Sequence, residues 1–320
     1  MEGKSRKMRK YDRNAVFNIA VKALLFAVVF ASALIILFLV LNLAFVISLI
    51  VSPVLGLAAV FLFSYLLRYT GFYYSYYAFS SGFLFKQKQG NVYCPCCGKH
   101  FDHFEDLRFY DDVKHYNPEM FKKSRQDVIC DCCRSAPRQR IIAKWAEQNV
   151  ELLKSSKILY FAPELSMMLW FRKHGIKVTT ADLFDKRTDL KLDLTAIDLP
   201  DSSEDIVFCN HVLEHVSDYK VALSELHRVL KKGGRLIISF PVNYDFDEVY
   251  EEKTGSAKER IKLFGQDDHL RVFGKNSKKM LEEAGFEVGS ISLEGLPQEI
   301  VPVTGPADYD TNEIFCCVKK

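Results

Sequence analysis

The pattern of apolar and polar positions separates an amino-terminal membrane-like segment from the rest of the chain. No charged side chain occurs between Ala23 and Leu67. A helix crosses the apolar core of a bilayer with roughly 20 apolar residues, so a run of this length predicts two spans joined by a tight turn. We expect spans near residues 22–41 and 44–67, with the turn at Asn42. A hairpin that dips into one leaflet is the alternative.

The residues that flank the apolar run predict its orientation. Six basic side chains precede it within residues 1–13, and Arg68, Lys86 and Lys88 follow it. Because positive residues stay on the cytoplasmic side, both ends of the hairpin should be cytoplasmic. A secretory signal peptide is the alternative, but its apolar region is only about 7–15 residues long. We therefore expect a multi-pass protein of the inner or plasma membrane, with the lipid bilayer as its partner and the following domain in the cytoplasm.

Further along the chain, apolar runs of strand length alternate with helical patterns. Strands are predicted at Lys157–Phe161, Ile176–Ala181, Asp205–Cys209, Arg235–Pro241, Phe286–Leu293 and Glu313–Val318. Helices are predicted at Arg138–Glu151, at Leu165–His174, from the end of the third strand through Leu230, and at Ser277–Ala284. The glycines of Lys231–Gly234 should end the third helix with a left-handed cap. Strands separated by crossover helices predict an α/β fold with a doubly wound, mostly parallel sheet.

Composition and charge add two constraints. The net charge is +3, which gives no reason to expect a nucleic-acid partner. The chain has nine cysteines, and six of them lie in two tight clusters. Since a cytoplasmic domain is kept reduced, metal binding explains these clusters better than disulfides do.

The two cysteine clusters have the spacing of a zinc site. Each contains a C-x-x-C pair, and two such pairs supply the four thiolates that a structural, four-coordinate zinc prefers. The pairs that we expect to bind zinc are Cys94 with Cys97 and Cys130 with Cys133. Gly98 favours the first pair, because a glycine there lets backbone amides turn toward the sulfur atoms. Cys96 and Cys132 offer rival pairings, His100 and His103 are further candidate ligands, and unliganded buried cysteines are the plain alternative.

These boundaries divide the chain into five segments. They are a basic cytoplasmic tail (1–14), a two-span transmembrane hairpin (15–68), an aromatic juxtamembrane linker (69–92), a zinc-ribbon module (93–135) and a final α/β domain (136–320).

Residues 157–241 resemble a class I S-adenosylmethionine-dependent methyltransferase. Together with the cysteine pairs and the motif Ser135-x-x-Arg138-x-Arg140, residues 93–320 resemble a bacterial subgroup of that family with an N-terminal zinc ribbon. The resemblance implies a Rossmann-like methyltransferase fold, S-adenosyl-L-methionine as cofactor and a structural zinc. It does not extend to the membrane hairpin.

The ends of the predicted strands supply the candidate cofactor site, because open α/β sheets bind ligands beyond the carboxyl ends of their strands. Phe161, Ala162 and Glu164 end the first strand and would line the methionine and ribose. Asp182 and Leu183 end the second, where a carboxylate can accept both ribose hydroxyls. By resemblance, Asp193 and Leu194 occupy the position that meets the adenine. Asn210 ends the strand beneath the sulfonium. Asp182 and Asp193 could instead be ordinary turn or cap residues.

The first loop departs from the family pattern. It reads Ala162-Pro163-Glu164, whereas the family usually has a glycine-rich loop there, and glycine allows close backbone approach to a ligand. Glu164 could compensate by pairing with the ammonium group of the cofactor. A non-catalytic membrane scaffold with a degenerate methyltransferase fold is the alternative that this loop supports.

Two histidines are the candidate catalytic residues. His211 and His269 could remove the proton of an acceptor hydroxyl, because imidazole titrates near working pH. Arg271 either joins His269 in the acceptor pocket or pairs with Asp267 or Asp268. The acceptor would be a small molecule, a lipid or a glycan, and the membrane anchor suggests a lipid, a lipid-linked glycan or a membrane-associated sugar.

One further motif has a competing interpretation. Residues 211–215 read H-x-x-E-H, which also occurs in inverted zinc peptidases. In that class, His211 and His215 would share a metal from one face of a helix. The peptidase is the less favoured alternative, because the motif directly follows an apolar strand of the α/β domain.

Overall fold

The computed structural model describes residue 32 and residues 90–105, 128–252, 255–291 and 314–320. The chain separates into two compact units, Met1–Leu66 and Leu67–Lys320, and nearly all of the described residues belong to the second. The predicted tail, hairpin and most of the linker lie outside the described residues and stay predictions. Among the residues that are described, no helix is long and apolar enough to span a membrane.

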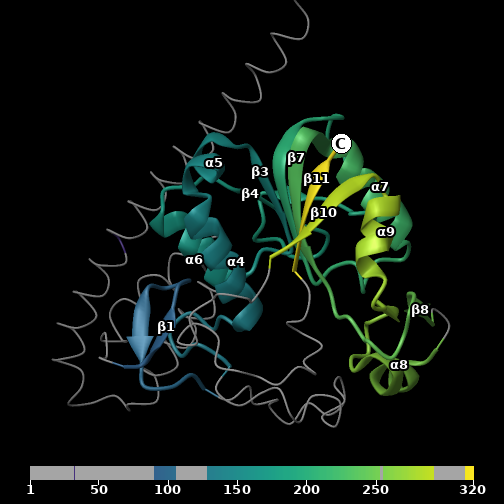
Figure 1. Ribbon diagram of the computed structural model, residues 1–320, viewed down its shortest axis with the longest axis horizontal. Helices are drawn as coiled ribbons and strands as arrows, with labels where there is room; N and C mark the ends of the chain where they lie inside the picture. Colours follow the sequence, from purple (N-terminus) through teal and green to yellow (C-terminus); the bar gives the residue numbers. More distant parts are fainter. Residues whose placement is uncertain (1–31, 33–89, 106–127, 253–254, 292–313) are drawn as a thin grey trace, which may run out of the picture. The chain divides into compact units, whose positions relative to one another are not determined.

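A seven-stranded sheet forms the centre of the second unit (Figure 1). Its strands are β3 (Ile158–Phe161), β4 (Thr179–Asp182), β5 (Leu190–Lys191), β6 (Glu204–Asn210), β7 (Leu230–Ser239), β10 (Phe286–Ser290) and β11 (Ile314–Lys319). Their order is β10-β11-β7-β6-β3-β4-β5. Within this sheet, β11 alone runs against its neighbours. The prediction of a doubly wound, mostly parallel sheet is confirmed.

Helices cover both faces of the sheet, because successive strand side chains point to opposite faces and both faces are apolar. Figure 1 shows α4 (Pro137–Gln148), α5 (Val150–Ser155) and α6 (Leu165–Lys173) on one side. On the other side lie α7 (Tyr219–Val229) and α9 (Ser277–Glu283). Along β3, Leu159 packs into the cluster beneath α7 and α9, whereas the next residue, Tyr160, packs into the cluster beneath α4 and α6.

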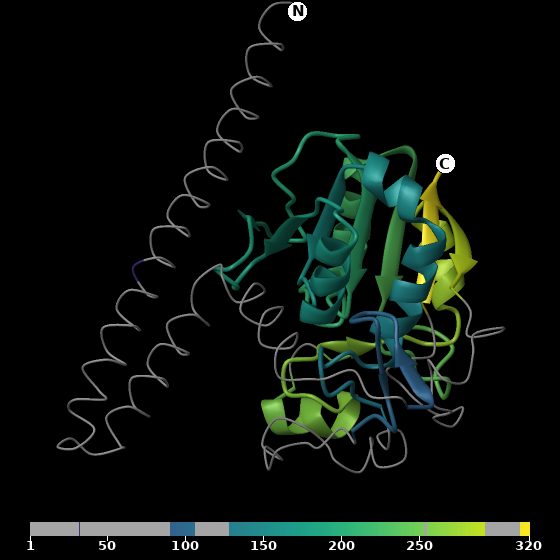
Figure 2. The same cartoon turned by 90° about the vertical axis from the view of Figure 1, so that its left-hand side faces the viewer.

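Two short antiparallel strand pairs form separate two-stranded sheets outside the central sheet. β1 (Val92–Cys94) and β2 (Lys99–Phe101) form an antiparallel hairpin that contains the first cysteine pair. Between β7 and α9, an insertion contains β8 (Tyr250–Glu251), α8 (Ala257–Phe264) and β9 (Arg271–Val272). Figure 2 shows α8 beyond the end of the sheet at which β6 and β7 finish. The backbone N–H of Leu270 donates to the carbonyl of Glu214, which joins the insertion to the loop after β6.

Three predicted helix boundaries are wrong. The predicted helix Arg138–Glu151 is interrupted at Asn149, whose non-helical backbone separates α4 from α5. The third helix begins only at Tyr219, because the Asp218 carboxylate accepts from the amides of Lys220 and Val221 and caps it. It ends at Val229 in an extended cap residue rather than at a glycine, and the following residues, including Lys231–Gly234, belong to β7.

Candidate functional site

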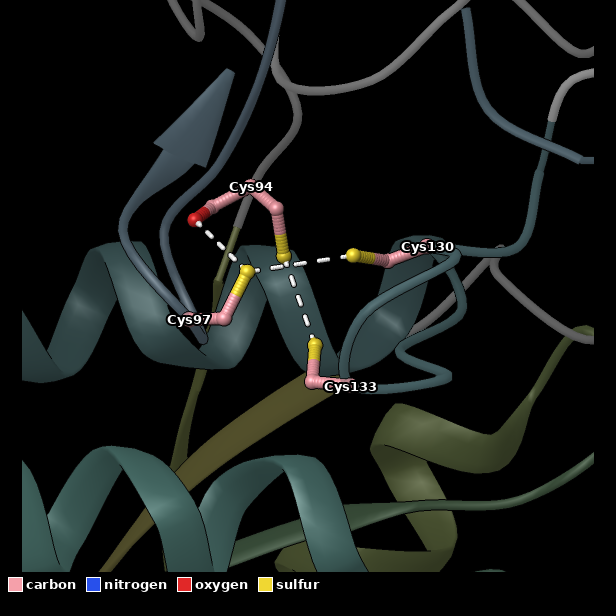
Figure 3. Close-up of side chains that lie close together, drawn as sticks. All are labelled: Cys94, Cys97, Cys130 and Cys133. Carbon is pink, nitrogen blue, oxygen red and sulfur yellow. Dashed lines mark hydrogen bonds between the residues drawn. The ribbon is translucent and has the colours of Figure 1, made fainter. Parts of the chain in front are cut away.

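The four predicted zinc ligands form one cluster. Figure 3 shows their sulfur atoms turned toward one another, two from the β1–β2 hairpin and two from the loop before α4. All four Sγ atoms lie within 4.8 Å of one another. The Sγ atoms of Cys94 and Cys133 are 3.6 Å apart, and those of Cys97 and Cys130 are 3.8 Å apart. Zinc–sulfur bonds of about 2.3 Å in a tetrahedron require sulfur separations of about 3.8 Å, so the cluster fits a four-coordinate metal.

The two C-x-x-C turns have the same backbone geometry. The amide of Gly98 donates to the carbonyl of Cys94 at 2.7 Å, and the amide of Arg134 donates to that of Cys130 at 2.8 Å. The donor residue is left-handed in both turns, with φ of 73° at Gly98 and 60° at Arg134. Glycine adopts this conformation without strain, which explains the glycine of the first turn. The Gly98 amide binds the backbone carbonyl of Cys94, so this contact does not support the prediction that the amide turns toward a sulfur atom.

The Ser135-x-x-Arg138-x-Arg140 motif connects the cysteine cluster to the α/β domain. The Oγ of Ser135 lies 3.1 Å from the Sγ of Cys94. Arg140 is fully buried, and its Nη1 donates to the carbonyls of Val128 and Ser135 at 2.8 Å. Arg138 donates to Glu164 in the loop that follows β3. The motif therefore has a structural role both in the cysteine module and in the loop after β3.

The predicted cofactor residues follow adjacent strands at one edge of the sheet. From β5 through β4 and β3 to β6, these ends carry Asp193, Asp182, Ala162 and Asn210 in spatial order. The chain leaves β3 toward β4 and β5 in one direction and continues to β6 and β7 in the other. The carboxyl ends of β3 and β6 are therefore the topological switch point, where open α/β sheets bind ligands.

Two residues at this switch point have unusual backbone conformations. Ala162 has φ of 47° and His211 has φ of 53°, in the left-handed region that residues with a Cβ rarely adopt. Ala162 thus takes, with strain, a conformation that glycine would take freely. Such positions concentrate at ligand sites, where the surrounding structure holds them in place. Here the amide of Ala162 donates to the carbonyl of Ala181 and that of His211 to the carbonyl of Ser239.

Glu164 is already bound to groups of this chain. Its Oε1 accepts from Arg138, at 2.7 Å from Nη2, and from the side-chain amide of Gln139. Its Oε2 accepts from the Tyr160 hydroxyl at 3.0 Å. Burial, and secondarily the Glu164 charge, raises the pKa of Tyr160 well above its ordinary value, so this hydroxyl remains a donor. The contacts give Glu164 a structural role and do not support its predicted pairing with an ammonium group.

The two predicted aspartates lie in tight turns. Oδ1 of Asp182 accepts from the amides of Phe184 and Asp185 at 2.7 and 2.8 Å. Oδ1 of Asp193 accepts from the amide and hydroxyl of Thr195 at 2.8 and 2.7 Å. In each case the turn fixes one carboxylate oxygen and leaves the other for a ligand. The turn-residue alternative is therefore compatible with a binding role.

The apolar candidates differ in exposure. Phe161 is 2% exposed and Leu194 is 4% exposed, and both side chains pack into the core. The structure therefore gives no support for side-chain contacts of these two residues with the cofactor, and their place in the site stays a prediction. Leu183 is 36% exposed, and the neighbouring Phe184, which the sequence analysis missed, is 85% exposed. The sequence shows only an aromatic residue two positions after Asp182; its exposure is seen in the structure.

The buried polar groups at the end of β6 are incompletely paired. Asn210 is 2% exposed; its Oδ1 accepts from the Ser239 hydroxyl at 2.9 Å, and its Nδ2 has no hydrogen-bond partner among the described residues. The Nε2 of His211 is also buried without a partner there. Its Nδ1 lies 3.2 Å from Oε1 of Glu214. The site therefore presents one amide donor and one imidazole nitrogen that are free for a ligand.

Glu214 lies at the centre of three histidines. Burial alone would raise its pKa, but the contact with His211 and the nearby His215 and His269 outweigh burial and lower the pKa to about 2. Burial would also lower the pKa of His215, but Asp268, 3.2 Å from its Nδ1, and Glu214 raise it. The Glu214 carboxylate is therefore ionised at neutral pH.

His269 and Arg271 come from the insertion, and both are buried. His269 is 3% exposed, its Nδ1 lies 3.3 Å from the carbonyl of Phe264, and burial lowers its pKa. Arg271 pairs with Glu251 and donates to the carbonyl of Leu213 at 2.6 Å. These contacts hold the insertion against the loop after β6, and the predicted pairing of Arg271 with Asp267 or Asp268 stays a prediction.

The H-x-x-E-H sequence does not form the helical pair that the peptidase interpretation requires. Residues 211–218 form turns, and the helix begins at Tyr219. The ring of His215 lies against that of His269, with centroids 4.7 Å apart, whereas His211 contacts Glu214. The prediction that His215 is a helical residue is wrong for the same reason.

Comparison with known proteins identifies the class of the α/β domain. Residues 166–238 match the family model described as a methyltransferase domain. A Streptomyces fradiae protein described as an "Uncharacterized 37.1 kDa protein in transposon TN4556" is 31% identical over 105 residues. The match spans 31% of this chain and 29% of that protein.

Two solved structures have similar folds. One is the 1,6-didemethyltoxoflavin-N1-methyltransferase of Burkholderia thailandensis, with 15% identity and a TM-score of 0.38, covering 56% of this chain and 78% of that one. The other is phosphoethanolamine N-methyltransferase 2 of Haemonchus contortus, with 17% identity and a TM-score of 0.34, covering 54% and 52%. Both structures contain S-adenosylhomocysteine.

The family match and the strand order together define the class. The domain that contains residues 166–238 is a class I S-adenosylmethionine-dependent methyltransferase domain, and the class predicted from residues 157–241 is confirmed.

Proposed function

We propose that the protein is a membrane-anchored enzyme that transfers a methyl group from S-adenosylmethionine to a hydroxyl of a lipid, a lipid-linked glycan or a membrane-associated sugar. The observation that carries the proposal is the convergence of Ala162, Asp182, Asn210 and His211 on one edge of the sheet, at the switch point of a methyltransferase domain. Within the described part of the chain, these residues include a buried amide nitrogen and a buried imidazole nitrogen that have no hydrogen-bond partner.

Each of the candidate residues at this edge would contact a different group of the cofactor. Asp182 would accept the ribose hydroxyls with the oxygen that its turn leaves available. Asp193, two strands from the switch point, would meet the adenine amino group. The Nδ2 of Asn210 would donate to an acceptor atom of the cofactor, which would satisfy a buried donor that otherwise has no partner. The backbone at Ala162 would lie against the cofactor, and its strained conformation supports that role.

His211 is the proposed general base. When bound, S-adenosylmethionine supplies an electrophilic methyl group bonded to a positively charged sulfur. The buried Glu214 carboxylate, 3.2 Å from Nδ1, would orient the imidazole and stabilise its protonated form, so that Nε2 accepts the proton of the acceptor hydroxyl. Holding the acceptor in line with the methyl group supplies most of the acceleration, because fixed geometry can contribute about 7–11 kcal/mol.

The cysteine cluster would hold a structural zinc. Four thiolates at tetrahedral separations complete the coordination of the ion and leave no position for a substrate. The ion would stabilise the hairpin and the loop before α4. Arg138, in the first turn of α4 directly after that loop, binds Glu164 beside the candidate cofactor site.

The acceptor class rests on the membrane anchor predicted for residues 15–68. An enzyme held at the bilayer encounters lipids and lipid-linked glycans at high local concentration. The assay that tests this is methyl transfer by the full-length protein in lipid vesicles, with S-adenosylmethionine labelled on the methyl group. We expect the label in a lipid or glycan fraction, and its loss in His211→Ala but not in the control His227→Ala. Transfer only to water-soluble acceptors would contradict the proposed acceptor class.

A non-catalytic scaffold is the second candidate. It is favoured by one observation: side chains of this chain already bind both carboxylate oxygens of Glu164, which was expected to compensate for the missing glycines of the first loop. A scaffold would neither bind the cofactor nor transfer a methyl group.

A further inference from the structure

A second group of potential metal ligands lies apart from the cysteine cluster. Glu214 and His215, in the loop after β6, meet His269 of the insertion, and one ligand atom from each lies within 4.8 Å of the other two. Glu214 is fully buried, His269 is 3% exposed and His215 is partly exposed. His269 lies more than fifty positions after Glu214 and His215 in sequence, and the hydrogen bond from the Leu270 amide to the Glu214 carbonyl joins the two segments.

The Glu214 carboxylate has no hydrogen bond among the described residues. Both of its oxygens are buried, and neither has a hydrogen-bond partner there. The Nδ1 of His211 contacts Oε1 at 3.2 Å, which leaves Oε2 with no partner among the described residues. A buried carboxylate is strongly unfavourable unless it is hydrogen-bonded, paired with a cation or coordinated to a metal. A cation at this carboxylate would remove that cost.

Both imidazoles are oriented as metal ligands usually are. The Nδ1 of His215 lies 3.2 Å from Oδ2 of Asp268, and the Nδ1 of His269 lies 3.3 Å from the carbonyl oxygen of Phe264. A histidine that donates from one ring nitrogen to a carboxylate or carbonyl presents the other nitrogen to a metal. Each Nε2 is therefore the ligand atom that these contacts leave available.

We propose that Glu214, His215 and His269 bind a divalent transition-metal ion, distinct from the zinc of the cysteine cluster. Imidazole suits ions such as Zn²⁺, and two histidines with one glutamate form a three-ligand set that leaves coordination positions open. The loop that supplies Glu214 and His215 begins at His211, and the Nδ1 of His211 contacts Glu214, so the ion would lie close to the proposed general base. The ion would bind an oxygen atom of the acceptor; this role rests on the function proposed above, whereas the site itself does not.

Zinc content of matched variants tests the site. The full-length protein in detergent is stripped of metal, reloaded with Zn²⁺ and analysed for zinc per chain. Glu214→Gln and His269→Gln should each contain one zinc fewer than the wild type. His227→Gln, which changes a histidine that packs against Phe286 away from the cluster, should lose none. Equal zinc content in the wild type and in both cluster variants would overturn the proposal, whatever the cysteine cluster holds.

A second variant covers the case in which the buried substitutions prevent folding. The side chain of Asp268 is 64% exposed, so Asp268→Asn should fold normally. Since it weakens the support of His215, it should lower the affinity for Zn²⁺ about 10–100-fold in a competition titration with a chelator. Unchanged affinity would overturn the proposed ligand set. Binding of S-adenosylmethionine by the same samples is measured separately, so failure of the metal site and failure of the proposed function are distinguishable.

Discussion

Replacing Glu164 by alanine breaks the connection between the first loop of the sheet and α4. The side chains of Arg138 and Glu164 are 20% and 15% exposed, so water screens their 2.7 Å ion pair only partly. Charged hydrogen bonds contribute about 1.5–3 kcal/mol each, and removing one partner of a buried pair costs about 3–5 kcal/mol. The buried Tyr160 hydroxyl also loses its acceptor. We therefore expect Glu164→Ala to lower the free energy of unfolding by about 3 kcal/mol.

Urea unfolding followed by tryptophan fluorescence measures this loss, because the two tryptophans of the chain lie in α4 and α6, beside the connection. A double-mutant cycle with Arg138→Met should give a coupling energy of about 1.5–3 kcal/mol. Glu147→Ala, which breaks the more exposed pair with Lys144, is the control and should cost about 0.5 kcal/mol or less.

The same variant separates a structural role of Glu164 from a cofactor-binding one. Because both oxygens already accept hydrogen bonds from this chain, Glu164→Ala should lower the affinity for S-adenosylmethionine less than tenfold, or less than about 1.4 kcal/mol. A much larger loss of affinity with unchanged stability would refute this reasoning. That result would support the prediction that Glu164 binds the ammonium group of the cofactor.

Three further predictions concern the rest of the chain. Cys94→Ser should remove one zinc and destabilise the β1–β2 hairpin, because metal binding and folding are coupled, whereas Cys96→Ser should keep the metal; loss in both would reassign the ligands. Hydrogen bonds from Arg228 lower the pKa of Glu225, so this pair should stabilise the fold above about pH 4.5 and lose that effect as the pH falls further. Glu225→Gln should remove about 1 kcal/mol of that acid dependence in urea unfolding, and an unchanged profile would argue against it. Reporter fusions at residues 10 and 90 should both be cytoplasmic, and opposite sides would exclude the hairpin.

The strands were predictable because the sequence marks them with continuous apolar runs. β3, β6 and β10 lie within one or a few residues of their predicted ranges. Each is buried between two helical layers, so most of its residues are apolar and the run is easily recognised. The order of the strand ends at the site followed from the same pattern, since parallel strands present their carboxyl ends at one edge.

The apolar pattern missed the start of α7, which is determined by a local helix cap. The helix after β6 was expected to begin at once, but Ser217-Asp218 carries the cap, a signal that the sequence contains. The end of that helix was misread because Leu230 continues into an extended strand paired with Glu204. Tertiary pairing, which outweighs the local preference of the following glycines for a turn, is not visible in the sequence.

The group of Glu214, His215 and His269 could not be predicted from spacing. His269 lies in a polar stretch that reads as an exposed loop, yet it is buried. Its burial depends on Arg271, which donates to the carbonyls of Leu213 and Val216 and thereby fixes the insertion over the loop after β6. Contacts between segments this far apart in sequence exist only once the chain has folded.

Binding of S-adenosylmethionine to the full-length protein, measured by calorimetry, tests the central claim most directly. The wild type should bind, and Asp182→Ala should bind at least tenfold more weakly, because it loses charge-assisted hydrogen bonds that contribute about 1.5–3 kcal/mol each. Asp193→Ala should cost less, and the exposed Asp198→Ala should bind as the wild type does. If the folded, zinc-loaded wild-type protein shows no binding at millimolar cofactor, the enzyme proposal is wrong and the scaffold replaces it.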